Sequence, residues 1–425
     1  LVLYNFKTVT MFNKNTLAYF RFLPVQLLVG LLLCTWIPYL FVESNYLTQG
    51  FTKASTFNLL TSATLTVLTI LTLNFIRQFP GINSSTYILP VFLFWFALVF
   101  APAELTNYPF SLIYYCFSGI CLLSYLLIIN IINRHYTVQT LAYIPVGRAK
   151  NMPEQVPSAE WLKLDAINLD QAVSGIVTDL HSYDLTDDWQ EFIANKTLQG
   201  IPVYHHRHIR ESLTGRVRIN HMYENELGSL LPCENYMLLK YCLDFLIILL
   251  LLPFTLIIFL FTAIAIKLED NGKVFYTQLR VGHRGKTIKV YKFRSMHEKS
   301  KEILTVDNDD RITKVGQFIR KTRIDELPQF LNVIKGEMSL IGPRAEFVDF
   351  ALKLEQQVPF FNYRHIVKPG ISGWAQVNQG YATGAAETQL KIEYDFYYIK
   401  HISFTLDLLI FFRTIHTTFT GFGSR

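Results

Sequence analysis

The chain has 425 residues, of which 51% are hydrophobic, 15% aromatic and only 17% charged. This composition is too apolar and too poor in charge for an ordinary soluble protein, and the length allows more than one domain. Charge is also unevenly placed, because residues 1–136 carry only two acidic side chains, Glu43 and Glu104. Nearly all titratable chemistry therefore lies after residue 136.

The first third of the chain predicts a membrane bundle. Four apolar runs lie at about 22–41, 57–76, 87–101 and 109–133. A helix needs roughly 20 residues to cross a bilayer, so we expect four transmembrane helices within residues 20–136, after a cytoplasmic tail of residues 1–19. The positive-inside rule places both ends of the bundle in the cytoplasm. No charge falls in mid-span, so we expect an anchoring bundle that supports a homodimer rather than a transporter.

Residues 137–236 are interpreted as a small soluble α/β domain. The β-type runs and the helical pattern that suggest a Rossmann-like βαβ arrangement lie at 140–146, 175–180, 200–205 and 187–197. A dinucleotide fingerprint has three glycines after the first strand, whereas this chain has Gly147 alone. A dinucleotide site is therefore not expected.

Three histidines in this domain, His205, His206 and His208, could suggest a metal site. No carboxylate or cysteine accompanies them at the spacing of metal ligands. We therefore interpret them as part of a solvated basic loop.

A proline divides the long apolar segment that follows. Residues 245–266 are continuously apolar and could cross a bilayer if straight, but Pro253 removes a backbone hydrogen bond and predicts a kink. Basic residues flank both ends, which fits two cytoplasmic ends better than one. We predict a re-entrant helix–break–helix over residues 240–267, and a plain fifth span is the alternative.

A β-hairpin is predicted next, from residues 274–281 and 287–294 around the turn Gly282–Gly285. The sequence Asp307-Asn-Asp309 copies the Asp-x-Asp metal signature of inverting glycosyltransferases. Because it lies in a polar loop without a buried strand before it, we do not expect it to be functional.

The strongest candidate site is a pair of adjacent carboxylates, Asp325 and Glu326. Apolar residues recur at helical spacing from about Glu326 to Lys335, which predicts a short amphipathic helix with Asp325 as its N-cap. Three arginines flank the pair: Arg320, Arg323 and Arg344. A capped surface helix is the plain alternative. In a basic setting at a helix N-terminus, however, the pair suits a nucleophile and a metal ligand acting on a phosphate ester.

A family resemblance is carried by five motifs in fixed order. They lie at Lys292–Met296, Arg311–Gly316, Asp325–Gln329, Gly342–Arg344 and Lys368–Asn378. With them the chain from about Tyr236 to Arg425 resembles the bacterial sugar transferases called polyprenyl-phosphate glycosylphosphotransferases. It departs at Ala345, where a second proline usually follows Gly-Pro-Arg, and at Ser372, where Thr is usual. Ala345 puts the rigidity of that loop in doubt, not the chemistry.

The resemblance implies an α+β membrane protein of the bacterial inner membrane, with a monotopic α/β catalytic domain at residues 237–425 facing the cytoplasm. It implies transfer of a sugar-1-phosphate from a UDP-sugar to polyprenyl (undecaprenyl) phosphate, with release of UMP. This is the first membrane step of exopolysaccharide or O-antigen assembly, and no nucleic-acid partner is expected.

The resemblance also assigns roles to residues. Asp325 would be the nucleophile that forms a phosphosugar–aspartate intermediate, and Glu326 would hold Mg²⁺. The residues expected to bind substrate are Lys292, Arg294, Arg320, Arg323, Gln329, Arg344 and Arg364. The alternative enzyme is a membrane-bound inverting glycosyltransferase, which would release UDP. A non-catalytic scaffold of polysaccharide export is the third possibility, although a scaffold has no need for paired carboxylates among arginines.

Overall fold

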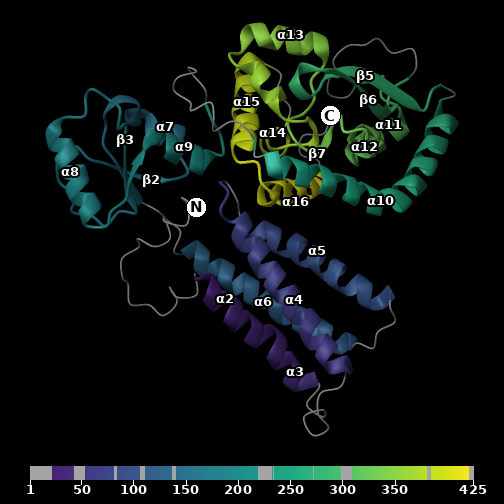
Figure 1. Ribbon diagram of the computed structural model, residues 1–425, viewed down its shortest axis with the longest axis horizontal. Helices are drawn as coiled ribbons and strands as arrows, with labels where there is room; N and C mark the ends of the chain where they lie inside the picture. Colours follow the sequence, from purple (N-terminus) through teal and green to yellow (C-terminus); the bar gives the residue numbers. More distant parts are fainter. Residues whose placement is uncertain are drawn as a thin grey trace. The chain divides into compact units, whose positions relative to one another are not determined.

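The structure is a computed structural model that describes residues 22–42, 53–80, 84–105, 111–135, 140–218, 232, 234–270, 272–297, 309–380 and 384–420. The chain divides into two compact units, residues 1–215 and 216–425, and each is described by itself. The first unit contains a bundle of apolar helices and a parallel sheet, and the second is an α+β unit that includes a long apolar helix (Figure 1).

The bundle confirms the predicted helical segments of the first third. Its elements are α2 (Leu23–Leu31), the π-helical turn η2 (Leu32–Trp36), α3 (Ile37–Val42), α4 (Lys53–Ile76), α5 (Ser84–Leu105) and α6 (Leu112–His135). Segments 23–42, 54–76 and 112–133 are long and apolar enough to cross a membrane, whereas the apolar part of α5, residues 85–101, is shorter. Polar side chains between the helices bond to one another, as Ser62 does to Tyr114 at 2.7 Å, which suits a bundle surrounded by lipid.

The sheet of the first unit is parallel throughout and has the strand order β2-β1-β3-β4. Its elements are β1 (Thr140–Tyr143), η4 (Gly147–Asn151), α7 (Met152–Gln155), β2 (Glu160–Lys163), β3 (Gly175–Thr178), α8 (Asp187–Leu198), β4 (Val203–His205) and α9 (His206–Thr214). Three strands and α8 were predicted. The edge strand β2 was missed, because its sequence Glu160-Trp-Leu-Lys163 has charged, exposed ends and no run of β-branched residues.

Both faces of this sheet are covered, as parallel sheets require. Successive residues of a strand point to opposite faces, so Leu141 packs with Ile209 of α9 on one side. Ala142 packs with Phe192 of α8 on the other side. Figure 1 shows α8 and α9 on opposite sides of the strands.

The interpretation of the three histidines as a loop is wrong, because all three lie in regular elements, and only His208 of α9 is solvent-exposed. His205 ends β4, and His206 begins α9 with its side chain buried. The carboxylate that faces them is that of Asp179, which follows β3. Spacing along the chain could not reveal this partner, because the sheet brings the ends of β3 and β4 together.

The second unit begins with α10 (Glu234–Glu269), which contains Pro253. No break separates two helices here, which corrects the predicted helix–break–helix, but Figure 1 shows α10 clearly bent. A proline removes only one backbone bond and displaces one turn, so a bend can accommodate it. The most apolar window of α10 is only 17% buried, compared with 33–44% for the bundle segments. This helix therefore exposes the most apolar surface of the spans.

The rest of the second unit starts with the predicted antiparallel hairpin of β5 (Phe275–Val281) and β6 (Thr287–Phe293), joined by η7 (His283–Gly285). The later elements are α11 (Lys314–Lys321), η8 (Ile324–Gln329), α12 (Phe330–Ile334), β7 (Ser339–Ile341), α13 (Val348–Gln357), η9 (Phe361–Ile366), β8 (Gly370–Ser372), α14 (Trp374–Asn378), α15 (Ala385–Lys400) and α16 (Phe404–Thr420). Strands β7 and β8 pair in parallel.

A buried ion pair fastens α10 to α16. The Lys240 ammonium lies 2.6 Å from Asp407 Oδ2, which also accepts a hydrogen bond from Tyr236 at 2.6 Å. Tyr398 donates to the other oxygen of Asp407 at 2.8 Å. Three donors thus converge on one buried carboxylate. Tyr236 and Lys240, one helical turn apart on α10, supply two of them.

We predict that Asp407→Asn strongly destabilises the second unit. Breaking a buried pair from one side leaves an uncompensated charge and costs about 3–5 kcal/mol. For a unit of this size the midpoint of thermal unfolding in detergent should fall by roughly 10 °C. The control is Asp349→Asn, which removes an exposed carboxylate from α13. Equal midpoints for the two variants would contradict the anchoring role of Asp407.

Candidate active site

The two adjacent carboxylates lie in a 3₁₀ helix rather than at the start of an α-helix. Element η8 runs from Ile324 to Gln329, and its N-cap is Arg323 in the left-handed region at φ 57°. The prediction of Asp325 as an N-cap is therefore wrong. Apolar spacing over so short a stretch does not distinguish a 3₁₀ helix from the first turns of an α-helix. Gly336, at φ +75°, follows the end of α12 as predicted.

Two cations from other elements meet the Glu326 carboxylate. Lys292 on β6 places Nζ 2.8 Å from Glu326 Oε1 and 3.9 Å from Asp325 Oδ2. Arg344, which follows β7, donates to the same Oε1 from both Nη1 and Nη2 at 3.2 Å. The side chains of Asp325 and Glu326 are only 13% and 8% exposed. The fold thus brings three of the five sequence motifs together at one buried pair.

The two carboxyl groups differ in their protonation. Burial raises the pKa of Asp325 to about 6, although Lys292 opposes the rise and the Glu326 charge adds to it. Burial acts on Glu326 in the same direction, yet the charges of Lys292 and Arg344 outweigh it and hold the pKa of Glu326 well below its usual range. Glu326 is therefore a permanent anion, and Asp325 is ionised chiefly above pH 6.

The loop that carries Arg344 is held by two buried arginines. Arg364 donates to the Arg344 carbonyl at 2.9 Å, and Arg280 donates to the Ala345 carbonyl at 2.6 Å. Arg364 itself is bound by Asp395 at 2.8 Å, and its side chain is 1% exposed. Arg364 was predicted to bind substrate, but the structure places it behind the loop. These bonds constrain the loop despite the alanine at position 345.

The glycines near Arg344 allow two backbone segments to touch. A Cβ atom on Gly370 would lie 2.0 Å from Gly342 N, and one on Gly373 would lie 2.2 Å from Gly342 O. The Gly342–Arg344 and Lys368–Trp374 segments therefore pack main chain against main chain. The structure therefore uses these glycines for close packing within the fold.

Four further residues were predicted to bind substrate, and they lie in different surroundings. Arg294 does not face the pair, because its guanidinium donates to the Asp270 carbonyl at 2.9 Å beside the end of α10. The positive charge of Arg320 lowers the pKa of Asp325, and that of Arg323 lowers the pKa of Glu326. Gln329 is buried at the end of η8. Lys292, Arg344, Arg320 and Arg323 are thus the cations that act on the carboxylates.

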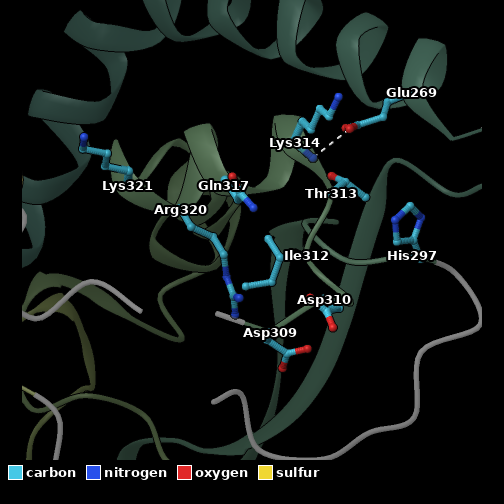
Figure 2. A pocket seen from close by; sticks show the side chains of 10 residues that line it. All are labelled: Glu269, His297, Asp309, Asp310, Ile312, Thr313, Lys314, Gln317, Arg320 and Lys321. Atoms are coloured by element: carbon cyan, nitrogen blue, oxygen red, sulfur yellow. Dashed lines mark hydrogen bonds between the residues drawn. The ribbon is translucent and has the colours of Figure 1, made fainter. Parts of the chain in front are cut away.

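Arg320 also lines a cavity of about 760 Å³ next to α11 (Figure 2). Glu269, from the end of α10, accepts hydrogen bonds there from the Lys314 and Val315 N–H groups at 2.7 and 2.9 Å. The carboxylates of Asp309 and Asp310 lie on another side of the cavity. Asp309 is paired with Arg311, and Asp307 lies outside the described residues.

Comparison with known proteins identifies the family. Residues 235–421 match the family described as bacterial sugar transferase. The chain is 42% identical over 352 residues to a UDP-N-acetylgalactosamine-undecaprenyl-phosphate N-acetylgalactosaminephosphotransferase of Aeromonas hydrophila, covering 82% of this chain and 83% of the relative. It is 43% identical over 168 residues to the UDP-glucose:undecaprenyl-phosphate glucose-1-phosphate transferase of Escherichia coli (strain K12), covering 38% of this chain and 36% of the relative.

A shorter relative is similar over most of its own length. Exopolysaccharide production protein PSS of Rhizobium leguminosarum bv. phaseoli is 40% identical over 182 residues, which are 41% of this chain and 89% of that protein. The chain belongs to the bacterial sugar transferase family, and it is an enzyme of the polyprenyl-phosphate sugar-phosphate transferase class.

The raised pKa of Asp325 predicts a pH-dependent stability. Its folded-state pKa of about 6 exceeds the ordinary 3.8, so the folded state binds the proton more tightly and loses stability as pH rises from about 4 to about 6. Asp325→Asn should remove this loss and make the variant more stable than wild type at pH 7.5 by on the order of 2 kcal/mol, or roughly 5 °C. The difference should shrink towards pH 4. A variant no more stable than wild type at pH 7.5 would contradict the burial of an ionised Asp325.

Proposed function

We propose that this protein transfers a sugar-1-phosphate from a UDP-sugar to undecaprenyl phosphate through a covalent intermediate on Asp325. The observation that carries the proposal is the difference between two adjacent carboxylates. Glu326 is bound by Lys292 at 2.8 Å and by Arg344, whereas the Lys292 ammonium lies 3.9 Å from Asp325 Oδ2. Asp325 is therefore held less tightly than Glu326 and is the better candidate for the nucleophile that attacks the donor phosphorus.

The first step forms a bond between a carboxylate oxygen of Asp325 and the β-phosphorus of the donor. The bond from that phosphorus to the bridging oxygen breaks, and UMP leaves with the electron pair. In the second step an oxygen of the lipid phosphate attacks the same phosphorus, and the Asp325 carboxylate leaves unchanged. Neither step needs a proton or a redox partner, because each nucleophile and each leaving group is an oxyanion.

The cations around the pair support this chemistry. A donor diphosphate and two carboxylates repel one another, so positive charge must offset the approach. Arg344 offers two N–H groups from one planar guanidinium, a geometry that matches phosphate oxygens. Lys292 supplies a compact charge beside the two carboxylates, and Arg320 of α11 and Arg323 at the start of η8 would add positive charge for the donor.

The residues also fit Mg²⁺, which prefers carboxylate oxygens together with substrate phosphates. Among the described residues, the hydrogen bonds made to the Glu326 carboxylate fall on Oε1. Glu326 therefore retains Oε2 as a ligand oxygen. Bound Mg²⁺ would neutralise charge on the diphosphate. We expect activity to require Mg²⁺ or Mn²⁺ and to disappear in EDTA.

We further infer that the second unit acts on the cytoplasmic side of the bacterial inner membrane. Helix α10, which is bent and contains Pro253, would enter and leave by one leaflet with its exposed apolar surface in lipid. The Lys240–Asp407 pair near the start of α10 and the Glu269 cap on α11 at its end would then lie on the same side of the membrane. This arrangement would bring a water-borne donor and a lipid acceptor to one depth.

Replacement of either carboxylate should abolish turnover. Asp325→Asn and Glu326→Gln should each lower UMP release by about three orders of magnitude or more, because one removes the nucleophile and the other an anion that positions two cations. Asp349→Asn is the control and should keep wild-type activity. Wild-type release by Asp325→Asn would refute the assignment. Release of UDP instead of UMP by the wild-type protein would favour the inverting glycosyltransferase.

The re-entrant path of α10 can be tested by cysteine labelling. Asn235 is exposed at the start of α10 and Leu268 is 83% exposed near its end, so each can be replaced singly by cysteine in a chain whose own cysteines are serine. Both positions should react with an impermeant reagent only from the cytoplasmic side. Pro253→Leu favours a straight helix by roughly 3 kcal/mol and should expose position 268 to the other side. Labelling of position 268 from outside while Pro253 is present would establish a plain span.

A further inference from the structure

A second cluster of chemically capable side chains lies in the first unit, at the carboxyl ends of its parallel strands. Strand β1 has β2 on one side and β3 on the other, so the strand order reverses direction between β1 and β3. Such a switch point is where open parallel sheets bind ligands. Asp179 follows β3, His205 ends β4 and His206 begins α9. The cluster therefore lies at the carboxyl edge of the sheet beside the switch point, and the turn after β1 reaches it through the Arg148 N–H.

The backbone fixes the Asp179 carboxylate in place. Its Oδ2 accepts a hydrogen bond from the Arg148 N–H at 3.0 Å, and its Oδ1 accepts one from the His181 N–H at 3.3 Å. The turn after β1 also approaches closely, because a Cβ on Gly147 would lie 2.6 Å from Asp179 Oδ2. The single glycine of this loop thus makes room for a carboxylate.

Two ring nitrogens face this carboxylate without completing a hydrogen bond. His205 Nε2 lies 3.4 Å and His206 Nδ1 3.7 Å from Asp179 Oδ1. Both nitrogens are buried, and neither completes a hydrogen bond of good geometry with any residue that the structure describes. The His206 side chain is only 5% exposed. Buried polar atoms are nearly always paired, so two of them on one carboxylate point to a missing third party.

We propose that Asp179, His205 and His206 form a binding site for a divalent transition-metal cation of the zinc type. One ligand atom from each residue can be chosen so that all three lie within 4.8 Å of one another. A tetrahedral ion with ligands at about 2.0–2.1 Å has edges of about 3.4 Å between ligand atoms, close to the two measured separations. Two imidazoles and one carboxylate are a donor set that suits zinc, cobalt or iron rather than magnesium.

Hydrogen bonds and charges next to these three residues affect how a metal ion would bind. His205 Nδ1 accepts the Arg207 N–H at 3.2 Å and thereby caps α9. With a metal at Nε2, the ring proton moves to Nδ1 and this cap is released, and water can satisfy an N–H in the first turn of a helix. The charges of Arg207 and Arg210 act on the same cluster and oppose a cation. Asp179 must therefore be the indispensable ligand.

Three protein ligands leave the fourth tetrahedral position open. The Asp179 and His205 side chains are 11% and 19% exposed, so the cluster is reachable from solvent. A closed structural zinc site uses four protein ligands, whereas an open one holds water or an exchangeable anion. The site therefore binds a metal that can in turn accept a small oxygen ligand.

The test measures bound metal directly on the full chain, purified in detergent with an affinity tag that contains no histidine. After chelator treatment the protein is dialysed against micromolar Zn²⁺ or Co²⁺ in excess Mg²⁺, and metal per chain is determined by elemental analysis. Wild type should hold one Zn²⁺ more than Asp179→Asn or His205→Gln, with an affinity loss of at least about 100-fold in the variants. His208→Ala is the matched control, because this exposed histidine lies on the same helix, and it should bind like wild type.

A measurement on the unmodified chain avoids dependence on variant folding. X-ray absorption at the zinc edge should show two imidazole ligands in a four-coordinate site, and the Co²⁺ form should show the visible bands of tetrahedral cobalt. Equal zinc content in wild type and Asp179→Asn, or a wild-type spectrum without imidazole, would overturn the proposal. Neither result bears on UMP release, which belongs to the second unit.

Discussion

Two adjacent carboxylates buried in one 3₁₀ turn impose the main constraint on the second unit. Buried charges are costly unless cations offset them, and the structure supplies Lys292 from the hairpin and Arg344 from the loop after β7. Both cations bind Glu326 and keep its pKa low, so Glu326 stays ionised. Burial raises the pKa of the neighbouring Asp325 to about 6. One environment thus gives two like groups different roles.

Much of the surrounding fold serves to keep these cations in position. Arg364 and Arg280 bind the consecutive carbonyls of Arg344 and Ala345, and glycines allow the neighbouring segment to pack directly on this loop. Helix α10 is bound at its start through the Lys240–Asp407 pair and at its end through the cap that Glu269 provides to α11. The apolar helix and the carboxylate pair are therefore parts of one connected structure, which suits an enzyme that acts on a lipid.

The sequence predicted what depends on local pattern, including the N-terminal helices, the hairpin, helix α8 and the end of α12 at Gly336. It could not show contacts that distant residues decide. The resemblance assigned Arg364 to the substrate, and the structure adds a buried partner, Asp395 of α15, that no local pattern indicates. Asp179 and the two histidines meet only because β3 and β4 are neighbours. The predicted break at Pro253 is wrong, because α10 continues through this proline as a single bent helix.

The central claim is that Asp325 becomes covalently phosphorylated by the donor. The most direct measurement incubates the protein with a UDP-sugar and Mg²⁺ without lipid acceptor, quenches in acid, and locates the added mass by peptide mass spectrometry. The account predicts a sugar-phosphate on Asp325 in wild type that disappears when undecaprenyl phosphate is added. UMP formation on lipid addition with no adduct at any stage, or an adduct that persists in Asp325→Asn, would contradict it.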